Sequence, residues 1–448
     1  MAKLIETRPP SGFRDYTPAM MVPRERVLQA AREVYRSYGF TPIDTPAAES
    51  LDVLLGKGGE ESDKRIYYLR HAESTKEEMG LRFDLTVPFA RFAARNINEL
   101  GTPFKRYAMG PVWRGERPAH GRFREFWQCD FDTIGTTSNA ADIEVALVVC
   151  DLFARLEIPG FALRINNRLV LNGLLEQLGI ADKANLVLRA LDKFDKIGRE
   201  KVAAEMAGVA GLSVPQADRV LSIATAAGTN EAILAALDEA CAGSAKAAEG
   251  LAKLRELLAA AACAGIPDGR IRIDPSIARG LDYYTGTIYE TTLTDLPGIG
   301  SVCSGGRYDN LASLYTNTPL PGVGASLGVD RLLAAMGELA HPWLAGAATS
   351  APVLILQLDA SRVGDYQRMG RALREAGVGA EVYPDPKKLG VQFQYAEKRG
   401  FRLAVIAGSD DFAKGVVQVK HLARREQQEV ADADLAMAAR LLLGMPAP

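Results

Sequence analysis

The sequence predicts an α+β protein in which a strand-rich N-terminal domain is interrupted by a helical insertion and followed by a C-terminal α/β domain. Strand-like runs alternate with charged loops up to Ile134 and resume at Ile271. Between Gly173 and Ala264 the chain is rich in Ala, Leu, Lys and Glu at helical spacing. Beyond Ala351, strand and helix patterns alternate, which is typical of a three-layer α/β domain.

In chain order, the first predicted element is an amphipathic helix over Arg24–Tyr38, which Gly39 ends. The following segment, FTPIDTP, is extended and made rigid by its two prolines. Residues 57–78 are polar around a short apolar centre, which indicates a hairpin or a mobile loop over a site. The same patterns predict strands at Leu81–Leu85, Phe104–Met109 and Phe126–Ile134, and helices at Pro88–Asn96, Ala140–Leu156, Val363–Ala376 and Gln392–Arg399.

These patterns also predict the domain boundaries. We expect a first domain at 1–336, interrupted by the helical insertion at 173–265. Residues 337–350 are rich in Ala and Gly and form a linker, and residues 351–448 form the C-terminal domain. A chain of 448 residues agrees with two or three domains.

Composition excludes several classes of protein. The N-terminus has no apolar core of a secretory signal, and the apolar stretches are too short to span a bilayer. The 5 cysteines are odd in number and never spaced CxxC, so we expect no disulfide framework, no metal site and a cytoplasmic location. The net charge of -2 does not indicate nucleic acid, although a local basic patch could still bind RNA.

The densest group of charged residues lies at 105–132, where a loop carrying Arg114, Glu116 and Arg122 joins two predicted strands. Arg114 follows an apolar run, so the base of its side chain should lie inside a sheet, where a guanidinium needs an anion such as phosphate. In the returning strand, Gln128 and Asp132 share one face with Asp130. The alternatives are a solvated charged hairpin and an edge strand with one wet face.

Four further segments carry polar or glycine patterns. Asp84 and Thr86 would share a strand face and could bind an ammonium group. The paired glycines of SVCSGGRYD mark either close backbone approach or a tight turn. GVGASLGVDRLL would let a flat ring lie against the backbone beside Arg331, or it is a structural packing site. RGLDYYTGTIYE predicts a strand that presents tyrosine hydroxyls and a glycine where a buried strand usually has Val and Ile.

Together these segments resemble the class II aminoacyl-tRNA synthetases, and specifically the histidyl-tRNA synthetase family. FTPIDTP resembles motif 1, the dimer-interface element; RYAMGPVWRGE and GRFREF resemble motif 2; GVGASLGVDRL resembles motif 3. RGLDYYTGTIYE and SVCSGGRYD resemble the two histidine-specific peptides. The resemblance implies an antiparallel sheet flanked by helices, a C-terminal anticodon-binding domain, a homodimer, and ligation of histidine to tRNA(His) through a histidyl-adenylate, with ATP and Mg²⁺.

The resemblance also implies site residues. The catalytic cations would be Arg279 and Arg114, both on the α-phosphate. ATP would further contact Glu116 at the adenine, Arg122 at the phosphates, and Arg331 beside the adenine and at the γ-phosphate. The histidine pocket would consist of Asp84, Thr86 and Gln128 at the α-amino group, Tyr284 and Asp132 at the imidazole, and Tyr283, Gly305, Gly306 and Tyr308 around them.

Two other functions share parts of this pattern. A histidine-binding regulatory subunit of ATP phosphoribosyltransferase generally lacks the anticodon-binding domain and parts of the catalytic set, which this chain has. Prolyl-type or threonyl-type synthetases share the three motifs but not RGLDYYTG or SGGRYD. The chain also departs from many bacterial relatives, since it has Asp84 and Asp132 where they carry Glu. Its RFDLTVP and QCDFD motifs are closer to those of the eukaryotic-type branch.

Overall fold

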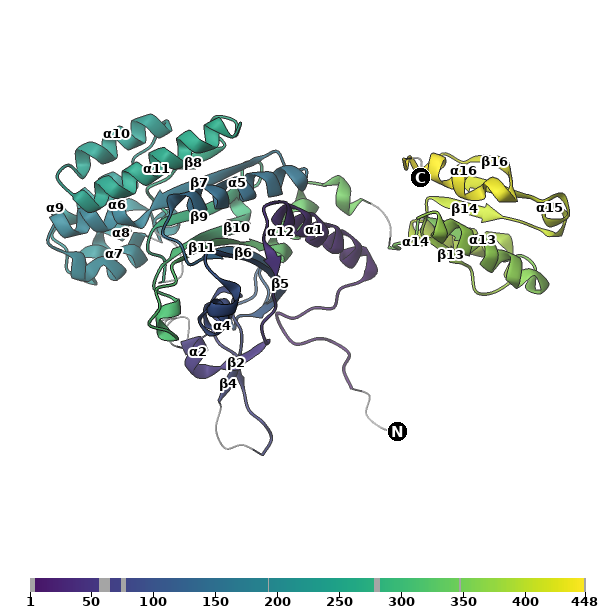
Figure 1. The fold of residues 1–448 in the computed structure, drawn as a ribbon, viewed down its shortest axis with the longest axis horizontal. Coiled ribbons are helices and arrows are strands. Elements are labelled where there is room, and N and C mark those ends of the chain that lie inside the picture. Colours follow the sequence, from purple (N-terminus) through teal and green to yellow (C-terminus); the bar gives the residue numbers. More distant parts are fainter. Residues whose placement is uncertain are drawn as a thin grey trace. The chain divides into compact units, whose positions relative to one another are not determined.

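A computed structural model of the chain describes residues 5–55, 65–73, 78–191, 193–277, 283–345 and 348–446. The chain divides into two compact units (Figure 1). The first contains residues 1–14 and 27–339, and the second contains 15–26 and 340–448. In the described part of the chain, no helix is both long and apolar enough to cross a membrane.

The first unit is built on an eight-stranded sheet within the described residues, with the order β1-β5-β6-β11-β10-β9-β7-β8. The pairs β1–β5 and β7–β8 at the two edges are parallel, and all pairs between them are antiparallel. The strands are β1 (Thr41–Pro42), β5 (Phe104–Trp113), β6 (Glu125–Ile134), β7 (Phe161–Asn167), β8 (Ile271–Ile273), β9 (Thr287–Leu293), β10 (Cys303–Tyr308) and β11 (Gly322–Gly328). The antiparallel sheet implied by the resemblance is therefore confirmed.

One face of this sheet is apolar and covered by helices. Phe131 of β6 packs its ring against Tyr35 of α1 (Pro18–Ser37), 4.8 Å between centroids. Tyr289 of β9 donates its hydroxyl to the Asp142 carbonyl of α5 (Asn139–Arg155) at 2.8 Å. The buried pair of Arg307 and Asp142 also ties β10 to α5. Because side chains alternate along a strand, the residues between these point to the opposite face, which carries the site.

The helices α6 to α11 lie together at the β7–β8 edge of the sheet (Figure 1). They are α6 (Arg168–Gln177), α7 (Ala184–Leu191), α8 (Phe194–Gly208), α9 (Val214–Ala224), α10 (Asn230–Ala240) and α11 (Ala245–Cys263). Ser244, Thr229 and Asn167 cap three of them by accepting a backbone N–H. The helical character predicted for this part of the chain is confirmed.

A three-stranded sheet, β2 (Ala48–Ser50), β4 (Met79–Leu81) and β3 (Tyr68–Leu69), lies beside α2 (Leu51–Leu55) and α4 (Thr86–Leu100). The antiparallel pair β3–β4 favours the hairpin over the mobile loop for 57–78, but it extends beyond that segment, since β4 begins at Met79; residues 57–64 and 74–77 lie outside the described residues. The strand expected at Leu81–Leu85 is wrong beyond Leu81. Asp84 Oδ1 instead accepts the Val87 N–H at 3.0 Å, and a carboxylate that bonds a first-turn amide favours a helix start.

The second unit has a five-stranded sheet in the described residues, with the order β13-β12-β14-β15-β16. Its strands are β12 (Val353–Ile355), β13 (Ala380–Val382), β14 (Leu403–Ile406), β15 (Val416–His421) and β16 (Glu426–Ala431). Its helices are α13 (Val363–Glu375), α14 (Leu389–Arg399), α15 (Ser409–Lys414) and α16 (Leu435–Leu443). The helix before them, α12 (Val329–Glu338), belongs to the first unit. Apolar clusters lie on both faces, as a three-layer α/β domain requires.

Candidate active site

Cross-strand register places a polar row over four neighbouring strands of the larger sheet. Asp130 of β6 pairs with Ser326 of β11, Ser326 pairs with Ser304 of β10, and Ser304 pairs with Glu290 of β9. Directly opposed residues point to the same face of an antiparallel sheet. All four side chains belong to a cavity of about 280 Å³, so this row forms its base.

The neighbouring row is built from small residues. It runs from Asp132 through Gly324 to Gly306. A Cβ on Gly324 would lie 2.2 Å from Asp132 Oδ1, and a Cβ on Gly306 would lie 2.9 Å from the Tyr284 ring. Both glycines therefore leave room for a neighbouring side chain, which is the close approach predicted from SVCSGGRYD.

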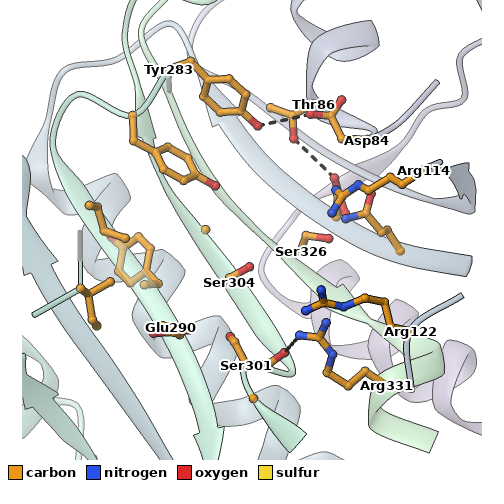
Figure 2. Close-up of a pocket in the computed structure, with 18 of the residues that line it drawn as sticks. Asp84, Thr86, Arg114, Arg122, Tyr283, Glu290, Ser301, Ser304, Ser326 and Arg331 are labelled. Carbon is orange, nitrogen blue, oxygen red and sulfur yellow. Dashed lines mark hydrogen bonds between the residues drawn. The ribbon is translucent and has the colours of Figure 1, made fainter. Parts of the chain in front are cut away.

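One end of the 280 Å³ cavity is formed by Asp84, Thr86, Tyr283 and Tyr284. Figure 2 shows Tyr283 pointing toward Asp84 and Thr86. The Tyr283 hydroxyl donates to Asp84 Oδ2 at 3.4 Å, and the rings of Tyr283 and Tyr284 meet edge to face at 5.1 Å. Gln128 Oε1, buried beside them, has no hydrogen-bond partner among the described residues. This end of the cavity offers acceptors and phenols to a ligand.

Asp132 lies behind this cavity rather than among its lining residues. It is 2% exposed, and its carboxylate pairs with Arg106 Nη2 at 2.6 Å and accepts the Tyr308 hydroxyl at 2.6 Å. Arg106 is fully buried and also donates to the Leu85 carbonyl at 3.1 Å. Asp132, Tyr308 and Gly306 therefore support the pocket from behind in this structure.

A second cavity of about 350 Å³ adjoins the first and shares Arg114, Arg122 and Arg331 with it. Figure 2 shows Arg122 and Arg331 side by side at the end away from Tyr283. Arg331 donates to the Ser301 carbonyl, and Arg114 Nε donates to the Phe83 carbonyl at 2.9 Å. Burial and the charges of Arg122 and Arg114 lower the pKa of Arg331. Three converging guanidiniums make an anion site, and phosphates fit it.

Glu116 also lines the second cavity. It accepts from Arg65 Nη1 at 3.0 Å and lies 3.6 Å from Arg122 Nη1. A carboxylate attracts the guanidiniums beside it, and its oxygens also offer a purine amino group a hydrogen-bond acceptor. The second cavity therefore combines an acceptor with an anion site.

Residues 12–14 of the N-terminal segment contact two elements that line the second cavity. Arg14 Nη2 pairs with Asp330 Oδ1 at 2.5 Å, and the Arg14 guanidinium lies 3.8 Å from the Phe123 ring centroid. Asp330 Oδ2 also accepts the Trp127 N–H at 2.7 Å. The Arg124 N–H donates to the Gly12 carbonyl at 2.9 Å. Residues 12–14 thus connect the motif 2 hairpin to α12.

Burial raises the pKa of all three carboxyls at the first end of the site. Desolvation is the largest cause for Asp84 and Asp132, opposed by nearby guanidiniums and hydrogen bonds. The pKa of Asp130 rises to about 7, because desolvation and the charges of Asp132 and Asp84 outweigh the attraction of Arg106. Perturbed carboxyls in a cavity are typical of functional sites.

Among the polar residues that line the first cavity, sequence reasoning missed Asp130, Glu290, Ser301, Ser304 and Ser326. The alternation of β6 already put Asp130 between Gln128 and Asp132, so that signal was present. The prediction that Asp84 and Thr86 share a strand face is wrong, since both lie at the start of α4, yet both line the cavity. The strand predicted in RGLDYYTGTIYE begins only at Thr287, after both tyrosines.

Arg279 lies outside the described residues. The other predicted ATP residues, Arg114, Glu116, Arg122 and Arg331, all line the second cavity. Among the predicted histidine residues, Asp84, Thr86, Gln128, Tyr283, Tyr284 and Gly305 line the first. Residues predicted from five separate segments of the chain therefore meet at two adjoining cavities.

Comparison with known proteins gives the same result as this geometry. A family model described as histidyl-tRNA synthetase matches residues 12–332, and one described as an anticodon binding domain matches residues 353–440. The chain belongs to the histidyl-tRNA synthetase family. Its first match covers well over half of the chain, and the two together leave only short segments unmatched.

Relatives of this family resemble the chain over nearly its whole length. It is 55% identical to the histidine–tRNA ligase of Rhodopirellula baltica, over 96% of both chains. It is 43% identical to that of Xanthomonas campestris, over 97% of this chain and 96% of the other. The crystal structure of histidyl-tRNA synthetase from Nostoc sp. PCC 7120 superposes with a TM-score of 0.87 at 35% identity, covering 98% of this chain and 100% of that one.

A more distant structure tests the regulatory alternative. An ATP phosphoribosyltransferase regulatory subunit/histidyl-tRNA synthetase from Bacillus halodurans matches with a TM-score of 0.73 at 21% identity. At that identity the likeness shows the fold alone. The histidyl-tRNA synthetase family, an ATP-using ligase family of protein biosynthesis, is therefore the better supported assignment, and the predicted enzyme class and activity are confirmed.

Proposed function

We propose that the two adjoining cavities bind histidine and ATP and join them as histidyl-adenylate, which then acylates tRNA(His). The observation that supports this most directly is their shared wall. Arg114, Arg122 and Arg331 belong to both cavities, and Arg114 is the one of the three whose charge also acts on the Asp84 carboxyl. A cation there would meet the α-phosphate as the amino-acid carboxylate attacks it. Arg279 would be a second α-phosphate cation.

In the first cavity, Asp84, Thr86 and Gln128 would hold the α-ammonium group of histidine. Tyr284 would bond one imidazole nitrogen, with Tyr283 and Gly305 enclosing the ring. Asp132 would reach the other nitrogen if it exchanged its bond with Tyr308, and Gly306 gives the Tyr284 ring its place. A pocket that hydrogen-bonds both nitrogens rejects apolar side chains of similar size, since these would leave its polar groups unpaired.

In the second cavity, Arg122 and Arg331 would bind the outer phosphates, and Glu116 would accept from the adenine amino group. Mg²⁺ would enter with ATP as part of the substrate. This ion usually keeps one or two carboxylates together with phosphate oxygens. Glu290 and Glu116 line the adjoining cavities and fit that donor type.

The C-terminal unit would bind the anticodon arm of tRNA(His), and the insertion at 173–265 would lie near the acceptor arm. The basic residues available for phosphate contacts in the former are Lys387, Lys388, Lys398, Arg399, Arg402, Lys414, Lys420, Arg424 and Arg425. We also propose a homodimer through the motif 1 segment, in the cytoplasm. Sedimentation equilibrium gives the oligomeric state, and a monomer at micromolar concentration would contradict the dimer.

Amino-acid-dependent exchange of pyrophosphate into ATP, run with each of the twenty amino acids and without tRNA, tests the chemistry. We expect exchange with histidine alone, followed by charging of tRNA(His) when tRNA is added. A chain that binds histidine but exchanges with no amino acid would instead support the regulatory function. Exchange with another amino acid would contradict the imidazole contacts.

A further inference from the structure

The histidine end of the site has more buried negative charge than its own residues neutralise. Asp84, Asp130 and Asp132 are each no more than 3% exposed. In the described part of the chain, Asp132 pairs with the buried Arg106, whereas Asp84 and Asp130 form no ion pair. An unpaired buried carboxylate costs several kcal/mol unless a cation or strong donors compensate it. The cavity therefore fits a ligand that brings positive charge.

Asp130 lies where that charge would be needed. It is 1% exposed, it lines the first cavity, and its Oδ1 atom has no hydrogen-bond partner among the described residues. Its other oxygen, Oδ2, accepts the Thr86 hydroxyl at 3.5 Å. Another buried polar atom of the same cavity, Gln128 Oε1, also lacks a partner in the described chain, and Ser326 is the hydroxyl that faces Asp130 from the neighbouring strand. Buried polar atoms without partners are uncommon and call for a missing ligand or water.

We infer that Asp130 is a further specificity residue of the amino-acid pocket: it orients the Thr86 hydroxyl and supplies negative charge for the α-ammonium group of the substrate. This inference rests on the proposed histidine site. A cationic ligand favours the ionised form of Asp130, and an ionised carboxylate can only accept, so the 3.5 Å contact draws the Thr86 proton toward Asp130 when an ammonium group is bound. The lone pairs of Thr86 Oγ1 then face the cavity, where an ammonium group can donate to them. Asp84, which lines the same cavity, provides a second carboxylate.

Two analogues of histidine separate this role from a structural one. Histidinol keeps the ammonium and the imidazole but lacks the carboxylate, and imidazolepropionate keeps the carboxylate and the imidazole but lacks the ammonium. Each is titrated as an inhibitor of histidine-dependent pyrophosphate exchange. Asp130→Asn is close to isosteric but neutral. The control, Asp295→Asn, removes an exposed carboxylate that lines neither cavity.

For Asp130→Asn we expect the inhibition constant of histidinol to rise about tenfold or more, as for a lost hydrogen bond to a charged group. The constant for imidazolepropionate should change less than about twofold, since it offers no ammonium. The control should leave both unchanged. Equal weakening of both analogues, or unchanged binding of histidinol, would overturn the inference.

A second variant keeps the test decisive if Asp130→Asn folds poorly. Thr86→Val removes the hydroxyl at nearly constant volume. If Asp130 acts through Thr86, the double variant should weaken histidinol little more than the stronger single variant, whereas independent roles would multiply. Failure of the proposed function shows differently, because the unaltered enzyme would then support no exchange with histidine. The two outcomes are therefore distinguishable.

Discussion

The two ends of the active site are built on opposite physical plans. At the histidine end, Asp84, Asp130 and Gln128 are buried, two of them on a central strand, and their neighbours are fixed by cross-strand register. At the ATP end, Arg122 is 53% exposed in its side chain and projects from the motif 2 hairpin. Strand side chains preorganise acceptors for one small substrate, whereas hairpin guanidiniums can adjust to a flexible polyphosphate. In the proposed function, selectivity would therefore reside in the sheet, and Arg122 would stabilise charge from the exposed hairpin.

The largest effect should come from breaking the buried support of the histidine end. Asp132→Ala leaves Arg106 as an uncompensated buried charge, which should lower the free energy of unfolding by roughly 3–5 kcal/mol. It should also raise the histidine KM. Denaturant unfolding measures the first effect, and pyrophosphate exchange measures the second.

The double variant Asp132→Ala with Arg106→Met is the matched control. It removes the stranded charge and should recover much of the lost stability without restoring the histidine KM. An Asp132→Ala protein as stable as the original would mean that the Arg106–Asp132 pair does not support the pocket.

The second prediction concerns Arg114, which lines both cavities, and the rate of adenylate formation rather than stability. Arg114→Ala should reduce pyrophosphate exchange by about 10²–10³-fold, the usual result of removing one donor from a developing charge. Histidine binding, measured by calorimetry, should change little, because the proposed partner of Arg114 is the phosphate rather than the amino acid. Arg117→Ala is the control, since Arg117 is exposed and lines neither cavity. A drop of less than tenfold would remove Arg114 from the chemical step.

The buried carboxyl Asp130 predicts a smaller effect on stability that depends on pH. Its pKa rises to about 7 in the folded chain, from an ordinary value near 3.8. The folded state therefore holds the proton more tightly, and stability falls as pH rises from about 4 through 7. The groups facing Asp130 are Arg106 on β5, Asp132 on β6, Asp84 before α4 and Ser326 on β11.

Asp130→Asn removes this titration. At pH 8 the free energy of unfolding of the variant should exceed that of the original protein by on the order of 1–2 kcal/mol. A pKa shift of about three units corresponds to roughly 4 kcal/mol in full, and the variant should recover part of it. The gain should shrink as the pH falls toward 5. Melting curves at several pH values measure it, and a gain that is independent of pH would contradict the assigned titration.

The sequence predicted the fold and most of the site where one strand or one helix carries the pattern. Alternation along β6 placed Gln128, Asp130 and Asp132 on one face, and the structure confirms it. What alternation within one strand could not provide is the register between strands, which joins Asp130 to Ser304 and Glu290 and gives Asp132 its partner Arg106. The strand predicted for Asp84 and Thr86 is wrong because the sequence pattern does not show where α4 begins, and the bond from the Val87 N–H to Asp84 depends on that start.

The smallest effect should sharpen the contrast at the ATP end. Arg14 lies outside both cavities but pairs with Asp330 and covers Phe123, so it connects the motif 2 hairpin to α12. Arg14→Ala should loosen that connection and raise the KM for ATP about three- to tenfold, equivalent to roughly 1 kcal/mol, with the histidine KM unchanged. Arg8→Ala, an exposed arginine of the same segment, is the control. A rise in the histidine KM of equal size would show that the two ends do not act as separate structural units.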